Sequence, residues 1–108
     1  MKAVYITEFD GASVELRDVP DLAKPTGGQI LVRVRAAGLN RADLLQARGL
    51  YPPPAGYSPN VPGLEFAGEI AAIGDDVKNL QAGERVFGIT TGEAQAEYLL
   101  IDASLCAK

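Results

Sequence analysis

Residues 63–74 read GLEFAGEIAAIG, and this stretch decides the fold. Glycines stand at positions 63, 68 and 74, and residues 83–86 (GERV) follow after a polar interval. The apolar residues between the glycines favour extended structure, so we expect a strand over residues 66–73. Because glycine permits positive φ and a close approach of two backbones, the spacing predicts turns that flank a compact pair of strands.

Short apolar runs bounded by turn residues predict further strands on both sides of this stretch. Residues 14–19 alternate between apolar and charged side chains, which predicts a strand with one buried side and one side facing water. In residues 29–37 the apolar side chains at positions 30, 32 and 34 share one face. We therefore expect a mainly β domain, a small barrel or sandwich, with strands over residues 1–7, 14–19, 29–37, 66–73, 85–89 and 96–101.

Residues 40–48 predict the one substantial helix of the chain. Asn40 is a favourable N-cap, Asp43 stands in the first turn, and Gly49 ends the helix. Five prolines then lie between residues 50 and 62, and their missing N–H groups exclude a regular ladder of hydrogen bonds. We expect a structured surface loop there.

The composition excludes several kinds of active site. The 108 residues have the size of one domain, and they contain no histidine and a single cysteine, Cys106. A Ser/His/Asp triad, a Cys/His pair and a zinc site built from histidine or several thiolates are therefore excluded within this chain. Chemistry has to come from carboxylates, tyrosines, amides, backbone dipoles or a cofactor.

Charge and hydropathy also limit the partners. The net charge is −4 and the lysines and arginines are scattered singly, so we expect no nucleic-acid partner. The apolar runs are far shorter than a bilayer is thick, and we expect no membrane partner. The lone Cys106 fits a reducing cytoplasm, and without a basic neighbour it is expected to be a buried or incidental thiol rather than a nucleophile.

The glycine spacing resembles the GroES-like domain of the medium-chain dehydrogenase/reductase superfamily, where G-H-E-x-x-G-x-x-x-x-x-G and G-D-R-V recur. Zinc-dependent members of that superfamily carry a ligating histidine where this chain has Leu64 and a ligating cysteine where it has Asn40. Neither leucine nor asparagine replaces those ligands, so the sequence resembles the zinc-independent quinone oxidoreductase branch. Residues 39–54 (LNRADLLQARGLYPPP) are similar to the L-N-x-x-D, x-G-x-Y and prolines of that branch. The type named after a p53-inducible protein is the most similar, because the ζ-crystallin type usually has a tyrosine where Leu45 stands.

This resemblance runs from Met1 to Lys108 and implies a fold and an activity. The fold is mainly β with one or two short helices, a GroES-like, partly open β-barrel with the Rossmann domain absent. Residues 1–108 would be the GroES-like, alcohol-dehydrogenase-type catalytic domain, the N-terminal fragment of a two-domain enzyme. That enzyme would be an NADPH:quinone oxidoreductase that transfers hydride from the nicotinamide of NADP(H) to a small-molecule quinone, without zinc and as a homodimer when full length.

The chain lacks a G-x-G-x-x-G between a strand and a helix, so the cofactor phosphates have no binding motif here. Residues 99–108 show neither a polar tail nor a completed helix, and we expect the protein to continue. NADP(H) would be bound mostly by a missing C-terminal dinucleotide-binding domain. The isolated chain is therefore expected to be inactive.

By matching position, Asn40, Asp43 and Tyr51 would line the cleft where nicotinamide meets the quinone. The resemblance gives Tyr51 and Asn40 a catalytic role and Asn40 and Asp43 a cofactor-binding role. Each residue also has a structural explanation: Asn40 caps the helix, Asp43 is a favourable first-turn acid, and the Tyr51 ring anchors the loop. Glu65 is expected to satisfy backbone N–H groups in a tight turn.

Two alternative functions remain open. One is an enoyl or alkenal reductase of the same superfamily, which these motifs do not separate from a quinone oxidoreductase. The other is a stand-alone GroES-like binding module, which predicts a ring-forming oligomer with an exposed, mobile apolar loop. The proline-rich loop over residues 50–62 is too rigid for such a role.

Overall fold

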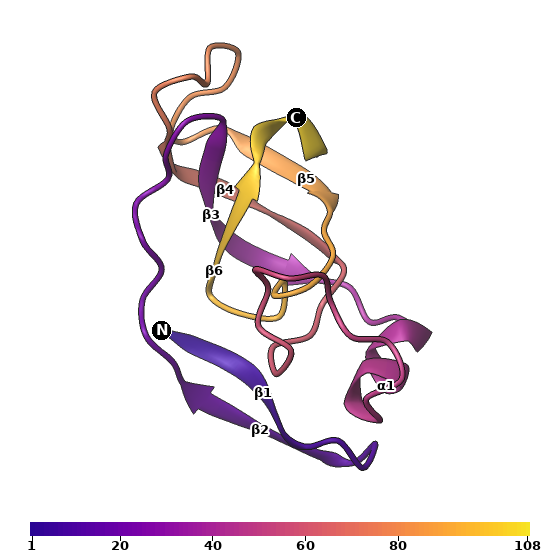
Figure 1. Cartoon of the computed structure of the whole chain (residues 1–108). Helices are drawn as coiled ribbons and strands as arrows, with labels where there is room; N and C mark the ends of the chain where they lie inside the picture. The colour runs from indigo at the N-terminus through magenta and orange to yellow at the C-terminus, as the bar shows by residue number, and fades with distance from the viewer.

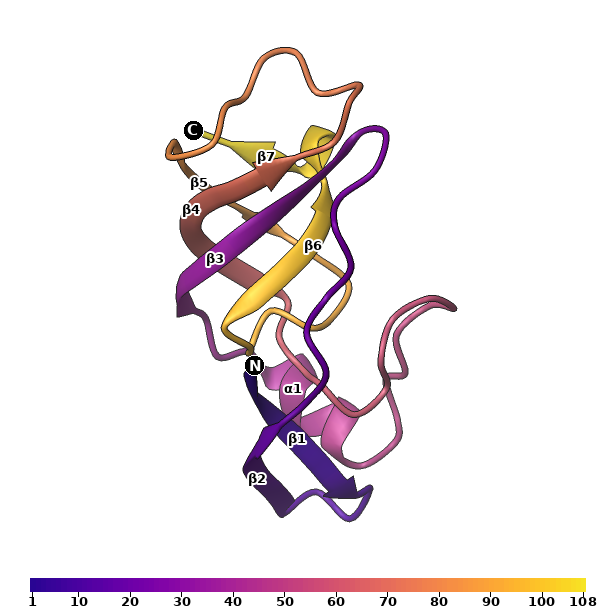
Figure 2. The ribbon, with the colours of Figure 1, turned by 90° about the vertical axis from the view of Figure 1, so that its left-hand side faces the viewer.

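A computed structural model describes residues 1–108. The chain forms two antiparallel sheets: strands β1 and β2 pair as a hairpin, and five strands pair in the order β6-β3-β4-β5-β7. The larger sheet curls into a half-barrel, with the hairpin and the helix at one end (Figures 1 and 2). The predicted mainly β, GroES-like, partly open barrel is thus confirmed. Its elements are β1 Lys2–Glu8, β2 Ser13–Asp18, β3 Gln29–Ala37, α1 Arg41–Ala47, β4 Glu65–Ile73, β5 Arg85–Ile89, β6 Tyr98–Asp102, the 3-10 turn η1 Ala103–Leu105 and β7 Cys106–Ala107.

The hydrophobic core lies inside the curl of the five-stranded sheet. Ile30 and Val32 of β3 are fully buried, while Arg33 and Arg35 of the same strand face water, as the alternation predicts. Leu99 of β6 is also completely buried and belongs to the same core cluster. The alternation of apolar and charged residues in 29–37 therefore indicates which side of the sheet faces the core.

The glycines of the 63–74 stretch serve the two purposes that their spacing predicts. Gly63 has φ of 116°, and a Cβ placed on it would lie 2.5 Å from the backbone nitrogen of Gln95. Gly68 lies within β4, and a Cβ there would stand 2.2 Å from the carbonyl oxygen of Arg33 on β3. One glycine thus allows an unusual backbone angle and the other a close approach of two strands.

The predicted buried side of residues 14–19 is wrong. Strand β2 forms as expected, but Val14 and Leu16 are 53% and 70% exposed. The reason is that β2 pairs only with β1, and no strand of the larger sheet pairs with β2. The contacts of the hairpin with the rest of the molecule include the Ala3 to Ala96 bridge of β1 and, at the hairpin turn, the hydrogen bond from Gly11 N–H to the Ala47 carbonyl. The apolar side of β2 therefore lies outside the core.

The end of the chain holds two elements that the sequence patterns do not predict. The Asp102 carboxylate accepts a hydrogen bond from Ser104 N–H at 2.9 Å and so begins the turn η1. Strand β7 then pairs with β5 through Cys106 and Ala107. The seven-residue α1 is the longest helix, and no helix is long and apolar enough to span a bilayer.

Candidate functional site

The start of helix α1 brings two of the three predicted site residues together. Asn40 is the N-cap, with an extended backbone, as expected. Its N–H donates to Oδ2 of Asp43 at 2.9 Å, and the Asp43 N–H donates to the Asn40 carbonyl at 3.0 Å. These two bonds satisfy donors that the first turn of a helix leaves unpaired, so Asn40 and Asp43 stand at the predicted N-cap and first-turn positions, with the bonds made by the Asp43 carboxylate and the Asn40 backbone.

A third side chain, which the sequence analysis does not identify, joins this pair. Gln95 lies in the segment between β5 and β6, and its Nε2 donates to Asp43 Oδ2 at 3.0 Å. The same nitrogen lies 3.5 Å from the carbonyl oxygen of Gly38, at the end of β3. We call Asn40, Asp43 and Gln95 the capping cluster. Because Gln95 is 52 residues from Asp43 in the chain, no local pattern indicates this contact.

Two polar atoms of the capping cluster are buried without a hydrogen-bond partner. They are Nδ2 of Asn40, which is a donor, and Oδ1 of Asp43, which is an acceptor. Leaving a buried polar group unpaired costs about 1–3 kcal/mol. Native proteins keep few such groups, and each calls for an explanation such as a functional role.

Tyr51 lies apart from the capping cluster. It follows the end of α1 by four residues, its side chain is about half exposed, and its hydroxyl makes no hydrogen bond. The proline-rich loop in which it stands reaches away from the helix (Figure 2). The loop returns to the body at Ser58, whose N–H donates to the Glu93 carboxylate at 3.0 Å. Within this chain, Tyr51 makes no hydrogen bond with Asn40 or Asp43.

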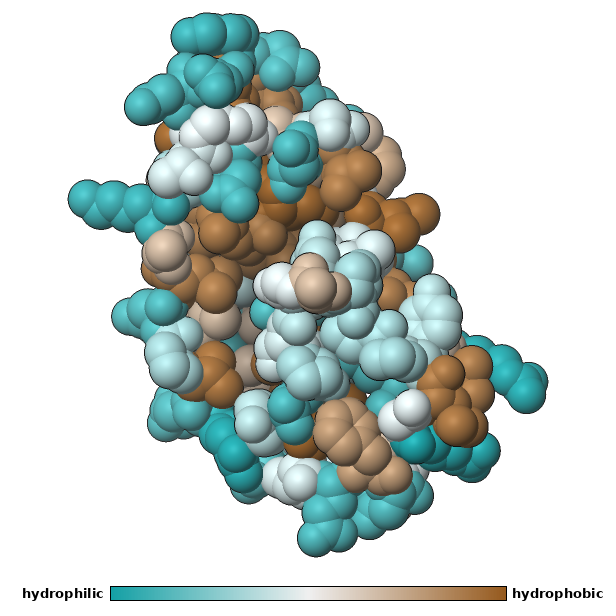
Figure 3. All heavy atoms as spheres, viewed as in Figure 1, coloured by the Kyte–Doolittle hydropathy of each residue, from teal (hydrophilic) through white to brown (hydrophobic).

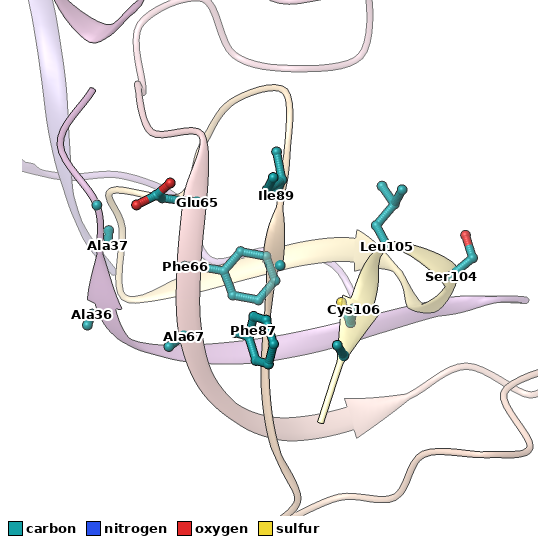
Figure 4. Close-up of a pocket in the computed structure, with 13 residues that line it drawn as sticks. Ala36, Ala37, Glu65, Phe66, Ala67, Phe87, Ile89, Ser104, Leu105 and Cys106 are labelled. Carbon is teal, nitrogen blue, oxygen red and sulfur yellow. The ribbon is translucent and has the colours of Figure 1, made fainter. Parts of the chain in front are cut away.

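Beside the capping cluster, an open groove of about 850 Å³ runs over β4, β5 and β7 (Figure 4). On the face shown in Figure 3, apolar side chains gather over the five-stranded sheet, while the hairpin end is mostly polar with a few apolar side chains between. We call the hollow the apolar groove, because Phe87, Ile89 and Leu105 line it and are 55%, 72% and 51% exposed. Gly38 is shared, since it lines the groove and its carbonyl faces Gln95. Asn40, Asp43 and Tyr51 do not line it.

The two titratable side chains of the groove are Glu65 and Cys106. Burial, and secondarily the charge of Asp102, raises the pKa of the Cys106 thiol, which is the direction opposite to that of an activated nucleophile. The expectation for Glu65 is wrong: its carboxylate accepts no backbone N–H. Glu65 is exposed at the first residue of β4, where water solvates the carboxylate. It lies instead against Gly38, where a Cβ would come within 1.9 Å of Oε1.

The structure brings no three histidine, cysteine or carboxylate side chains together in a group that fits a metal ion. Leu64, which stands at the position of a zinc ligand in the resemblance, is half-buried and offers no donor atom.

Comparison with known proteins assigns the fold to a family. The alcohol dehydrogenase GroES-like domain matches residues 26–108, most of the chain. The chain belongs to this family. The resemblance to the medium-chain dehydrogenase/reductase superfamily is thereby confirmed, and solved structures of the quinone oxidoreductase type are among its structural neighbours.

Three relatives illustrate how far the similarity reaches. The synaptic vesicle membrane protein VAT-1 homolog of Rattus norvegicus is 41% identical over 90 residues, which are 80% of this chain and 22% of the relative. A quinone oxidoreductase of Pseudomonas syringae superposes with a TM-score of 0.85 at 31% identity, covering 99% of this chain and 33% of that one. The quinone oxidoreductase of Escherichia coli, solved with NADPH, gives 0.83 at 28%, covering 98% and 32%. The chain thus spans a third or less of the length of each of these three proteins.

Proposed function

We propose that this chain is the substrate-side domain of an NADPH-dependent quinone oxidoreductase, which transfers hydride from nicotinamide to a quinone. The whole fold superposes on solved quinone oxidoreductases, and one of them was solved with NADPH, which supports the proposal. The observation that carries it is the pair of buried, unpaired atoms at the start of α1. They are a donor on Asn40 and an acceptor on Asp43.

These two atoms fit the chemistry of a nicotinamide. A primary carboxamide presents a carbonyl oxygen and an NH₂ group, which match the Asn40 Nδ2 donor and the Asp43 Oδ1 acceptor. Binding would replace two unpaired groups by two hydrogen bonds, one of them to a charged acceptor. Asn40 and Asp43 are therefore the residues that would hold the cofactor head group.

When bound, NADPH supplies the hydride. The task of this chain is to orient the ring against the quinone and to stabilise the negative charge that develops on the quinone oxygen. The Tyr51 hydroxyl makes no bond within the chain, so it is available to donate to that oxygen. Asn40 is the second donor for the same purpose.

We further propose that the reaction needs no zinc. Leucine has no ligating atom, and a neutral amide is a poor substitute for thiolate, so Leu64 and Asn40 do not reproduce a zinc site. Treatment of the whole protein with a metal chelator is expected to leave quinone turnover unchanged. Loss of turnover with the chelator, and its recovery on adding zinc, would contradict this part of the proposal.

The experiment compares the 108-residue chain with the longer protein that contains it. We expect the longer protein to oxidise NADPH with small quinones and the chain alone to show negligible turnover, because the chain has no motif for the cofactor phosphates. The same assay with enones and enoyl thioesters in place of the quinone tests the alternative reductase. A preference for an enoyl thioester would replace the quinone assignment by the alternative reductase, and turnover by the chain alone would refute its role as one half of a site.

A further inference from the structure

The backbone of Gln95 is held from three sides. Its N–H donates to the Pro62 carbonyl at 3.0 Å, and its carbonyl accepts from Val4 N–H of β1 at 2.9 Å. On the third side lies Gly63, where a Cβ would come within 2.5 Å of the Gln95 nitrogen and 2.9 Å of its Cγ. The first glycine of the 63–74 stretch therefore leaves the room in which Gln95 sits.

The side chain of Gln95 makes the bonds of the Asp43 carboxylate asymmetric. Oδ2 accepts from Gln95 Nε2 and from Asn40 N–H, while Oδ1 accepts nothing. No lysine or arginine pairs with Asp43, although charged pairs occur elsewhere on the surface. A neutral amide holds this carboxylate in place and leaves its negative charge uncompensated.

We propose that Gln95 is a positioning residue of the cofactor site. It fixes Oδ2 of Asp43 so that Oδ1 stays free to accept an N–H of a ligand carboxamide, beside the free Nδ2 donor of Asn40. The inference rests on the proposed function, because the carboxamide is that of NADPH. It adds a residue that touches neither cofactor nor substrate and acts through Asp43.

The chemistry explains why glutamine suits this place. A lysine or arginine would neutralise Asp43 and compete with the ligand for it, since charged donors bind carboxylates more strongly than amides do. An apolar side chain would leave Oδ2 with one bond and allow the carboxylate to rotate. Glutamine donates without adding a charge.

The test uses the longer protein that contains this chain, with three variants. Gln95→Met keeps the length of the side chain and removes the amide, while Gln81→Leu is the control, because the Gln81 side chain is exposed and makes no hydrogen bond. The double variant Asp43→Asn with Gln95→Glu exchanges donor and acceptor: it restores a hydrogen bond between the two positions but removes the Asp43 carboxylate. For each protein, calorimetry gives the dissociation constant of NADPH and thermal unfolding gives Tm.

We expect Gln95→Met to weaken NADPH binding about tenfold, the change that corresponds to one hydrogen bond. The double variant should recover only part of the loss in Tm, because the amide nitrogen that replaces Oδ2 cannot accept from Asn40 N–H. It should bind NADPH weakly, since the free acceptor has lost its charge. If Gln95→Met does not fold, the double variant still supplies both measurements. With quinone as substrate, Gln95→Met should raise KM for NADPH more than it lowers kcat.

Two results would overturn the inference. One is a lowered Tm with unchanged NADPH affinity in Gln95→Met, which would make Gln95 structural only. The other is full recovery of affinity in the double variant, which would show that the Asp43 charge is not used. Failure of the unaltered protein to bind NADPH is a different outcome, because it refutes the proposed function itself before any variant is compared.

Discussion

Gly38 lines the apolar groove, and its carbonyl faces Gln95 of the capping cluster, yet the two regions are built in opposite ways. The cluster is small and polar, and its atoms are held by hydrogen bonds from residues far apart in the chain. The groove is wide and open, and Phe87, Ile89 and Leu105 each expose about half of their surface or more. One region carries unpaired polar atoms in a buried place, and the other carries unpaired apolar surface in water.

The difference teaches what each region contributes. Buried polar atoms without partners lower stability, so the capping cluster is kept at a cost that a bound ligand would offset. Apolar side chains that stay exposed remove little apolar surface from water on folding, so they contribute little to stability. We therefore expect changes in and around the cluster to affect folding strongly, and changes in the groove to affect it weakly.

The largest effect should come from Gly63, which packs against the cluster. Gly63→Ala combines a strained φ of 116° with a Cβ that would lie 2.5 Å from the Gln95 nitrogen. Strain and overpacking together should lower the free energy of unfolding by about 4 kcal/mol, measured by urea denaturation. Gly83→Ala is the control, since Gly83 has φ of 91° but a Cβ placed on it would meet no atom within 4 Å. The free energy of unfolding of Gly83→Ala should fall by about 1 kcal/mol, from strain alone. Equal losses would show that the contact with Gln95 is not tight.

A smaller effect is expected at Asp43. Asp43→Ala removes the acceptor for Asn40 N–H at the start of α1 and the acceptor for Gln95, but it also removes the unpaired Oδ1. The two contributions partly cancel, and the free energy of unfolding should fall by about 1 kcal/mol. Asp75→Ala, at an exposed aspartate whose side chain makes no hydrogen bond, should leave it unchanged. A gain in stability in Asp43→Ala would mean that the unpaired oxygen outweighs the cap.

The same contrast explains what the sequence could predict. Helix α1, its cap Asn40 and the inward face of β3 depend on residues a few positions apart, and the local pattern predicted all three. The exposure of the apolar face of β2 was mispredicted, because alternation indicates that a strand has an apolar face and a polar face. It does not indicate whether another element covers the apolar face. Gln95 could not be found, since its role depends on contacts with Asp43 and Gly63 that only the fold creates.

In the groove, Ile89→Ser should change the free energy of unfolding by no more than about 0.5 kcal/mol, because Ile89 is 72% exposed. Leu99→Ala, which empties a fully buried position of the same sheet, should lose about 3 kcal/mol and serves as the control. Binding of an apolar fluorescent dye should nevertheless fall in Ile89→Ser, since the groove is the exposed apolar surface. A loss of stability near that of Leu99→Ala would show that Ile89 is part of the core.

The smallest effect concerns Cys106, the thiol that faces the groove. Burial and the charge of Asp102 raise its pKa above the ordinary value, so the folded chain binds this proton more tightly than the unfolded chain does. The resulting stability is present below the ordinary pKa of a thiol and is lost as the pH rises through the raised pKa of the folded state. Alkylation should accordingly be slower than that of a free cysteine at neutral pH, and its rate should keep rising where the free thiol has reached its plateau. The pH profile of the reaction with iodoacetamide, compared with the urea-unfolded chain, measures this. If the rate for the folded chain reached its plateau at the same pH as for the unfolded chain or at a lower pH, water would reach the thiol. The groove would then be open down to β7.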